Sequence, residues 1–313
     1  MKLKSRIYPK YLPLMILLGV GTLTACNDDD DIDPVEERES IVDIVVRDQN
    51  FSTLEAALTK AGLVEALSAD GPFTVFAPTN AAFQAAGITN LDDYTAEQLR
   101  AVLLYHVVDG QVNSSSLQDG QEVSTLNESD LYVSLNDGVF INGMTEVTTA
   151  DVEATNGVIH VIDRTLVPPS QDIVEIAVAA GFTRLAEAVT EAGLVETLQG
   201  EGPFTVFAPT NEAFDALYQR LGVSGPAAID EETLAAVLTY HVLGARVFSS
   251  DLSDGATPAT LQGGTVEINL GSDVTIADKD PESADAKVAS ADILGTNGVI
   301  HVIDQILLPI ALE

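Results

Sequence analysis

The chain has little of the material from which disulfide scaffolds, sugar-stacking platforms or polyanion-binding surfaces are built. Its 313 residues include one cysteine, Cys26, so no internal disulfide can form. Tryptophan is absent and aromatic residues make up 5% of the chain, which disfavours a glycan site built on exposed rings. Acidic residues outnumber basic ones by 48 to 14, giving a net charge of −34. Such a field repels phosphate backbones, and we therefore expect no nucleic-acid partner.

Signatures of catalysis and metal binding are also missing. There is no Gly-x-Ser-x-Gly elbow and no glycine-rich phosphate loop. In so acidic a chain, pairs of carboxylates arise by chance and indicate nothing. The four histidines lack the i, i+4 spacing of a helical zinc site, and no cysteine accompanies them; they are His106, His160, His241 and His301. The sequence therefore predicts neither an enzyme nor a bound metal or cofactor.

What the chain does contain is a long-range repeat. Gly-Pro-Phe-Thr-Val-Phe-Ala-Pro-Thr-Asn at 71–80 returns unchanged at 202–211, 131 residues later. A second stretch, Thr-Asn-Gly-Val-Ile-His-Val-Ile-Asp, occurs at 155–163 and again at 296–304. Repeats this far apart indicate two whole domains rather than the stacked units of a solenoid. The prolines of Val167-Pro168-Pro169-Ser170 predict a stiff linker between domains at 40–169 and 170–313.

The first 25 residues predict a lipoprotein signal peptide. A basic stretch precedes the apolar run Leu12–Val20, which is too short for a stable membrane span. Leu23-Thr24-Ala25-Cys26 resembles a bacterial lipobox, which implies cleavage before Cys26 and acylation of that residue. A plain signal peptide with an incidental cysteine is the alternative.

Residues 26–39 predict an acidic, disordered tether, because they include the run Asp28–Asp31 and almost nothing apolar. Acidic residues directly after a lipidated cysteine resemble a surface-export signal of some Gram-negative bacteria. We therefore expect an outer-membrane lipoprotein exposed on the cell surface, with a periplasm-facing orientation as the alternative. The membrane contact is expected through the lipid anchor only.

Each repeat is predicted to begin with helices and end with strands. In the first repeat, a helix is expected over Ile41–Val46. Two further helices are expected, one opened by a capping box of Ser52 and Glu55 and one opened by a capping box of Thr95 and Gln98. The spacing between matching residues grows along the second repeat. We expect the extra residues in loops, at Tyr218–Ile229 and Lys279–Ala286.

The repeated stretches predict two structural motifs. Phe-Thr-Val-Phe alternates like a half-buried strand, proline ends it, and either the threonine or the asparagine that follows caps a helix. The later stretch carries an Asn-Gly pair typical of a tight hairpin, with a histidine in its second strand. The residues concerned are Pro78, Thr79, Asn80, Asn156, Gly157, His160, Pro209, Thr210, Asn211, Asn297, Gly298 and His301.

Together with a Tyr-His pair between them, these motifs occur twice in the same order and resemble the fasciclin domain. The resemblance covers about Ser40 to Leu312. It implies an α/β (α+β) fold in which each domain is a helical layer packed on a β-sandwich-like wedge. It also implies cell adhesion, association with matrix or glycans, and homotypic contacts. The candidate adhesion motif that it implies comprises Tyr105, His106, Tyr240 and His241.

The residues around the first Tyr-His pair favour a structural role for it. His106 ends an apolar helical face with Leu99, Val102 and Leu103, spaced at i, i+3, i+4 and i+7. A histidine in such a place is expected to be buried with a hydrogen-bond partner, and to complement the helix dipole at the C-terminal end.

The sequence thus predicts a lipid-anchored, non-catalytic adhesion or interaction module that binds extracellular proteins or polysaccharides. The alternative is a glycan- or small-ligand-binding lipoprotein that supports nutrient uptake. Exposed aromatic platforms would favour the alternative.

Overall fold

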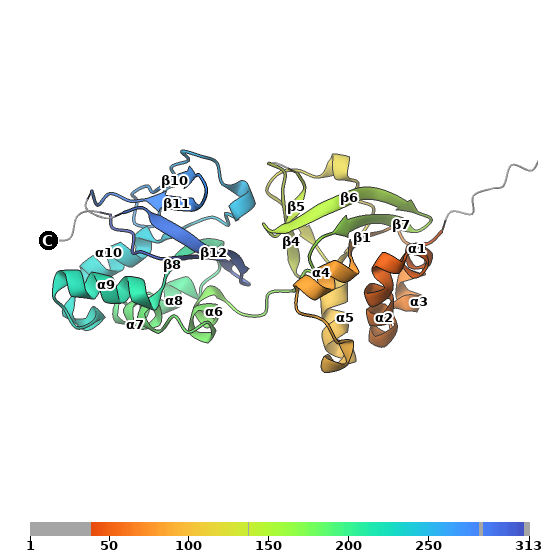
Figure 1. Cartoon of the computed structure of the whole chain (residues 1–313), viewed down its shortest axis with the longest axis horizontal. Coiled ribbons are helices and arrows are strands. Elements are labelled where there is room, and N and C mark those ends of the chain that lie inside the picture. The colour runs from red at the N-terminus through yellow and green to blue at the C-terminus, as the bar shows by residue number, and fades with distance from the viewer. Residues whose placement is uncertain (1–38, 137, 282–283, 310–313) are drawn as a thin grey trace, which may run out of the picture. The chain divides into compact units, whose positions relative to one another are not determined.

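The computed structural model describes residues 39–136, 138–281 and 284–309. Within these ranges the chain forms two sheets, each with its own helices (Figure 1). The predicted signal peptide, Cys26 and nearly all of the predicted tether lie outside the described residues.

The first domain has a sheet of seven strands in the order β2-β1-β7-β6-β5-β4-β3. The strands are β1 (Phe73–Pro78), β2 (Val107–Asp109), β3 (Gln121–Ser124), β4 (Asp130–Ser134), β5 (Phe140–Ile141), β6 (Thr145–Ala154) and β7 (Gly157–Ile162). Neighbouring strands are antiparallel except β1 and β7, which are parallel. The two repeated stretches of sequence therefore lie side by side as β1 and β7.

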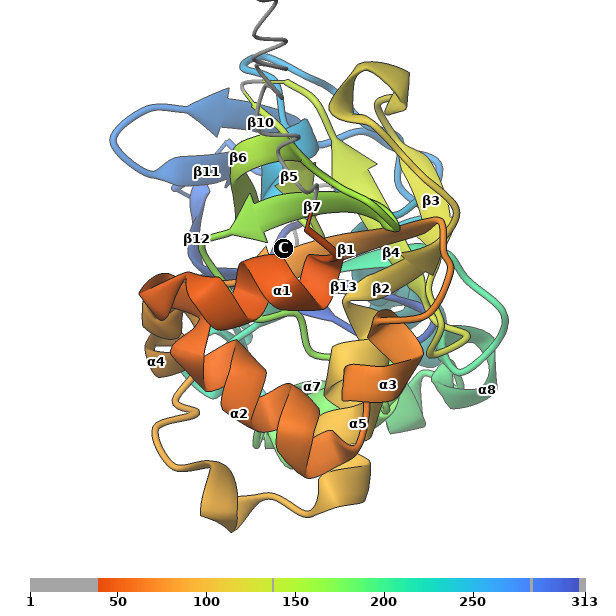
Figure 2. The same ribbon diagram turned by 90° about the vertical axis from the view of Figure 1, so that its right-hand side faces the viewer.

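Helices cover one face of these two strands. They are α1 (Ile41–Arg47), the 3-10 turn η1 (Gln49–Phe51), α2 (Ser52–Ala61), α3 (Val64–Leu67), α4 (Asn80–Ala85), the 3-10 turn η2 (Leu91–Asp93) and α5 (Ala96–Tyr105). Figure 2 shows α1, α2 and α3 gathered beneath β1 and β7. Leu54, Leu58 and Leu103 of these helices pack in one core with Val75 and Ala77 of β1.

The opposite face of β1 and β7 is buried by the same sheet, which bends over itself. Because side chains alternate along a strand, Phe76 points away from the helices and packs with Leu131 and Ile141 of β4 and β5. The bend lies in β6, whose pairing with β7 shifts register on either side of Thr149. Such bulges bend a strand and increase its twist. The fold is therefore a helical layer on a sandwich-like wedge, as predicted.

The second domain repeats this plan. Its helical segments are α6 (Ile173–Ala179), α7 (Thr183–Glu191), α8 (Val195–Leu198), α9 (Asn211–Leu221), the 3-10 turn η4 (Pro226–Ala228), α10 (Glu231–Tyr240) and the 3-10 turn η5 (Ser249–Asp251). Its strands are β8 (Phe204–Pro209), β9 (Val242–Leu243), β10 (Glu267–Leu270), β11 (Val274–Ala277), β12 (Ala286–Leu294) and β13 (Gly298–Ile303). They run in the order β10-β11-β12-β13-β8-β9, and only β13 and β8 among them are parallel neighbours.

The predicted Ser52/Glu55 capping box is wrong. Ser52 is already the first residue of α2, and the preceding Phe51 caps it with no side-chain hydrogen bond. The free N–H of Thr53 instead donates to Oδ1 of Asn80 at 2.9 Å, 27 residues along the chain. Thr79 caps α4 by accepting the N–H of Ala82 at 3.2 Å. The threonine and the asparagine therefore cap two different helices.

The second domain uses the same division of roles. Thr210 accepts the N–H of Ala213 at 3.3 Å, and Asn211 accepts that of Arg184 at 3.0 Å. The first predicted insertion, at Tyr218–Ile229, was expected to form a loop, and that is wrong. The helix α9 has 11 residues where α4 has 6, so extra residues at Tyr218–Leu221 lengthen a helix. The second lies between β11 and β12, where a loop was expected.

The Asn-Gly turn between β6 and β7 joins the sheet to the helices. Asn156 accepts the N–H of Ile41 at 3.0 Å and donates to the carbonyls of Leu67 and Ala69 at 2.8 and 3.0 Å. The next residue must be glycine, because a Cβ on Gly157 would lie 2.0 Å from a backbone oxygen of β1. Asn297 makes the equivalent three bonds in the second domain.

We expect Asn156→Ala to lower the free energy of unfolding of the first domain by about 1–3 kcal/mol, the cost of leaving buried partners unpaired. The second domain should be unaffected, because Asn297 remains. Urea unfolding of the two-domain protein measures both. Gln84→Ala, on the exposed side of α4, is the control and should change stability by less than about 0.5 kcal/mol. A loss of equal size in both variants would contradict this role for Asn156.

Candidate functional site

The Tyr-His pairs lie at the end of the last helix of each domain, where the chain enters β2 or β9. Tyr105 and Tyr240 have no exposed surface, and His106 and His241 are 1% and 2% exposed. The pairs therefore have almost no surface to offer an extracellular partner in this fold. The adhesion contact implied at these residues is not on the surface of either domain.

Each histidine of these pairs connects its helix to the last segment of its domain. Nδ1 of His106 lies 2.8 Å from the carbonyl of Val102, and Nε2 accepts the N–H of Leu166 at 3.0 Å. A carbonyl can only accept, so the proton of the neutral ring is on Nδ1. His241 makes the same two bonds, to the carbonyl of Val237 and from the N–H of Leu307, both at 2.8 Å.

Burial decides the charge of these two rings. It lowers the pKa of both His106 and His241 to about 4, from an ordinary value of 6.5. The free energy lost when an imidazolium ion is removed from water exceeds the free energy gained from its hydrogen bond to one backbone carbonyl. Both rings are neutral at pH 7, so each complements the C-terminal end of its helix through the Nδ1–H bond to a backbone carbonyl and not through a charge.

The tyrosines of the pairs are anchored through their hydroxyl groups. Tyr105 Oη donates to the carbonyl of Asp130 and accepts from Nδ2 of Asn142, both at 3.0 Å. Tyr240 Oη donates to the carbonyl of Thr265 at 2.7 Å. Burial raises the pKa of Tyr240 to about 12, so this hydroxyl stays protonated and keeps donating at neutral pH. The Tyr-His pair thus fastens the helix to the strands on one side and to the end of the domain on the other.

A serine, an aspartate and the second histidine also meet in each domain, a contact that was not predicted from the sequence. The backbone N–H of Ser114 donates to the carboxylate of Asp151 at 2.8 Å, and its hydroxyl donates to the same group. The backbone N–H of Asp151 donates to Nδ1 of His160 at 3.2 Å. Ser249, Asp292 and His301 have the same arrangement. The sequence signal was a nine-residue spacing from aspartate to histidine in both copies.

This constellation is not a catalytic triad. In a triad the histidine accepts the serine proton, and the aspartate orients the ring from its other side. Here the serine donates to the aspartate, and Nε2 of His160 donates to the carbonyl of Val112 at 2.8 Å. His301 is bound in the same way to Val247 at 2.9 Å. Both nitrogens of each ring are engaged, so neither ring can take a proton from the serine.

The two constellations differ in the burial of their carboxylates and in the direction in which the pKa of each is shifted. Asp151 is exposed, and hydrogen bonds from Ser114 lower its pKa. Asp292 is 6% exposed, and burial raises its pKa. Both aspartates sit in the bulges of β6 and β12, with φ of 57° and 59°. In that left-handed conformation Asp151 binds the loop at Ser114, and Asp292 binds the loop at Ser249. Both aspartates thus have a structural role.

Neither a metal cluster nor a membrane-spanning helix is found in the part of the chain that the structure describes. No three histidine, cysteine, aspartate or glutamate side chains among those residues lie where they could hold a metal ion. No helix formed by them is long and apolar enough to cross a bilayer.

Comparison with known proteins supports the resemblance. A family model described as Fasciclin domain matches residues 49–168 and again residues 180–309. Transforming growth factor-beta-induced protein ig-h3 of Sus scrofa is 31% identical over 250 residues, covering 76% of this chain and 35% of that protein. Periostin of Homo sapiens is 32% identical over 261 residues, covering 79% of this chain and 29% of periostin. The chain thus spans about a third of the length of these animal relatives.

A bacterial relative and a solved structure are similar as well. Protein sll1483 of Synechocystis is 44% identical over 134 residues, which is 42% of this chain and 74% of that protein. A FAS1 domain pair from the insect cell adhesion molecule Fasciclin I matches 83% of this chain and 97% of its own, at 20% identity and a TM-score of 0.40.

The low pKa of His106 predicts a loss of stability in weak acid. Between pH 6.5 and about 4 the unfolded chain binds a proton that the folded ring does not, so stability is full above this window and falls within it. The loss should reach about 3 kcal/mol at the acid end, at 1.36 kcal/mol per pH unit. His106→Gln keeps one donor and one acceptor but cannot titrate, and should remove this dependence from the first domain.

Thermal unfolding from pH 7 to pH 4 measures the effect. The second domain serves as an internal control, because His241 still titrates there. Asp43 and Asp151 have lowered pKa values, so their contribution is lost only below about pH 4, outside the window. Equal acid sensitivity of the first domain in the variant and the unmodified protein would exclude His106 as the cause.

Proposed function

The chain belongs to the fasciclin-domain family, and on that premise we propose that it is a non-catalytic adhesion module anchored to the outer membrane by lipid at Cys26. Fasciclin domains are associated with cell adhesion and extracellular interactions, and proteins of the family are generally non-catalytic. The observation that carries the proposal is the presence of two complete domains, each with its own buried cores. Either domain can therefore present a rigid surface to an extracellular protein, a polysaccharide or another copy of the chain.

The contact surface is proposed to include a leucine that lies beside the Tyr-His pair in both domains. Leu126 is 38% exposed, and its N–H donates to the carbonyl of Val107 at 2.8 Å, directly after His106. Leu261 is 43% exposed and bonds to Val242 at 2.7 Å in the same way. Single exposed leucines are common on proteins. Their recurrence at matched positions next to the buried, hydrogen-bonded Tyr-His pair of each domain favours a shared contact.

The charge of the chain limits the kinds of partner that it can bind. Four of its 14 basic residues precede Cys26, so a processed protein is more acidic than the net charge of −34 implies. A surface of that sign favours neutral or basic partners and disfavours anionic membranes. The acidic tether is proposed to hold the domains away from the bilayer.

Lipid anchoring is tested at Cys26. We expect labelling with a fatty-acid analogue to mark the protein in cells, and Cys26→Ser to abolish both the label and membrane association. Proteolysis of intact cells should digest the domains, because the proposed location faces outward. Complete protection would instead indicate the periplasm-facing orientation, and an unlabelled native protein would exclude the anchor.

Adhesion is tested with three purified proteins: residues 40–170, residues 171–313 and the two domains together. Binding to cells, matrix proteins and polysaccharides should be modest for each domain and about 10²–10⁴ times tighter for the pair, if both sites engage one repetitive partner. Leu126→Ser with Leu261→Ser should weaken binding by the pair at least tenfold, with folding retained, since surface changes usually alter stability by about 0.5 kcal/mol or less.

Leu270→Ser is the matched control, because Leu270 is 40% exposed and ends β10, while the carbonyl that Tyr240 binds, that of Thr265, lies before the other end of this strand. It should leave adhesion unchanged. An equal loss of adhesion in the control and in the double variant would show that Leu126 and Leu261 are not part of the contact surface. Saturable binding of a free sugar without adhesion would favour a role in nutrient uptake.

A further inference from the structure

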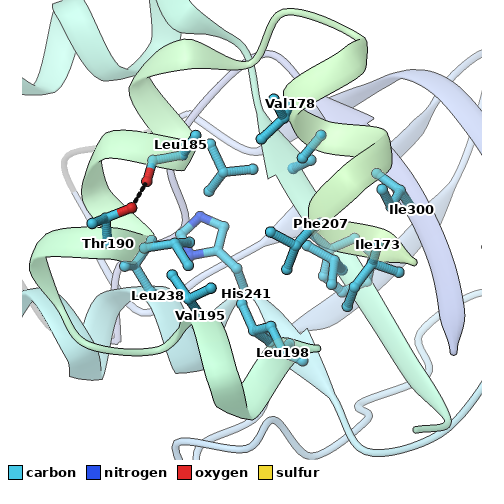
Figure 3. Close-up of a pocket in the computed structure, with 17 residues that line it drawn as sticks. Ile173, Val178, Leu185, Thr190, Val195, Leu198, Phe207, Leu238, His241 and Ile300 are labelled. Atoms are coloured by element: carbon cyan, nitrogen blue, oxygen red, sulfur yellow. Dashed lines mark hydrogen bonds between the residues drawn. The ribbon is translucent and has the colours of Figure 1, made fainter. Parts of the chain in front are cut away.

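A cavity of about 240 Å³ lies in the second domain between α6, α7, α8 and the sheet (Figure 3). Its walls include Leu185 and Val189 of α7, Leu198 of α8, Leu238 of α10 and Ile300 of β13. Two exposed residues, Val178 and Thr190, also border it, so it has a route to the surface between α6 and α7.

The cavity offers a ligand almost no hydrogen bonds. Among its lining residues, all within the described part of the chain, only Thr190 and His241 have polar side chains. The hydroxyl of Thr190 donates to the carbonyl of Ala186 at 2.7 Å. Both nitrogens of His241 are engaged by backbone groups at 2.8 Å. A molecule inside the cavity is therefore surrounded by hydrocarbon.

The matching region of the first domain is filled by larger side chains. Val45 stands where the second domain has Ala177, and Leu58 stands where it has Val189. Val45 and Leu58 are 1% and 3% exposed and belong to the core beneath α1 and α2. Two smaller side chains thus distinguish the second copy and enlarge the space between its helices and its sheet.

The size and surroundings of the cavity define a class of ligand. An engineered cavity of about 150 Å³ with aliphatic and aromatic walls stays dry and binds benzene, so this one has room for about ten carbon atoms. The helices around it carry exposed acidic residues, and the one arginine on them, Arg184, is paired with Glu187 and Asp215 at 3.3 and 3.1 Å. That field disfavours carboxylates and other anions.

We propose that the second domain binds one uncharged hydrocarbon-like molecule of about ten carbon atoms in this cavity. Such a molecule restores the contacts that the smaller side chains leave unmade. It needs no polar partner inside. This binding is separate from adhesion through the outer surface, so each can fail without the other.

Naphthalene and indole form a matched pair for the test, because both are flat bicyclic aromatic molecules of similar size and indole has an N–H in place of one CH=CH unit of naphthalene. Equilibrium dialysis of the two-domain protein, residues 38–313, should show one naphthalene bound per chain. Indole should bind at least about tenfold more weakly, because its N–H finds no free acceptor in the cavity. Saturating naphthalene should also raise the melting temperature, since a ligand that binds only the folded state stabilises it.

Ala177→Val combined with Val189→Leu gives the second domain the side chains of the first and is the filled variant. Folding is checked by circular dichroism, and naphthalene affinity should fall at least about tenfold; if the pair does not fold, Val189→Leu alone should weaken binding. The proposal is overturned by the absence of naphthalene binding, by equal binding of indole, or by undiminished binding to a folded filled variant.

Discussion

In each domain the backbone of the Asn-Gly turn lies against the backbone at the start of the first strand, too close for any side chain between them. The N–H of Phe73 donates to the carbonyl of Asn156 at 2.9 Å, and that of Phe204 to Asn297 at 3.0 Å. A Cβ on Gly71 would lie 2.1 Å from the same Asn156 oxygen. This contact sets the register of the parallel strands. Because the Asn156 side chain also holds α1 and α3, it positions the helical layer at the same time.

The other repeated polar residues stabilise the remaining joints of the domain. Asn80 holds the start of α2, His106 holds the end of α5 to the segment after β7, and His160 holds the bulge of β6. Each of these groups is partly or wholly buried, and both rings are fully bonded. These repeated polar residues therefore maintain the scaffold. The proposed recognition uses exposed positions instead, and in the second domain the proposed ligand uses the cavity.

The sequence was sufficient for features that depend on neighbouring residues. The strand at Phe73–Phe76, the Asn156-Gly157 hairpin and the Thr95 capping box were predictable, because strand propensity, turn chemistry and caps act within a few residues. The prediction that this strand is half-buried was wrong, because Phe76 packs under the bent half of the sheet while Val75 and Ala77 face the helices, so both faces are buried. The cap provided by Asn80 was not, since its partner lies 27 residues away and meets it only in the folded domain. The Ser114–Asp151 contact spans 37 residues and was missed for the same reason. The cavity lies between helices and strands that meet only in the folded domain, so no local pattern reveals it.

The identity of the central strands in the two copies has a consequence for folding. β1 and β8 share one sequence, Phe-Thr-Val-Phe-Ala-Pro, and β7 and β13 share another, Gly-Val-Ile-His-Val-Ile. A mispaired β1 and β13 would make the same backbone bonds and side-chain contacts as the native partners, so strand chemistry alone cannot reject the exchange. Tandem repeats are prone to this kind of misassembly. A chain that emerges from its N-terminal end, whether from the ribosome or from an export channel, presents β7 to β1 before β8 and β13 emerge. The order of emergence rather than strand complementarity therefore favours the correct partner.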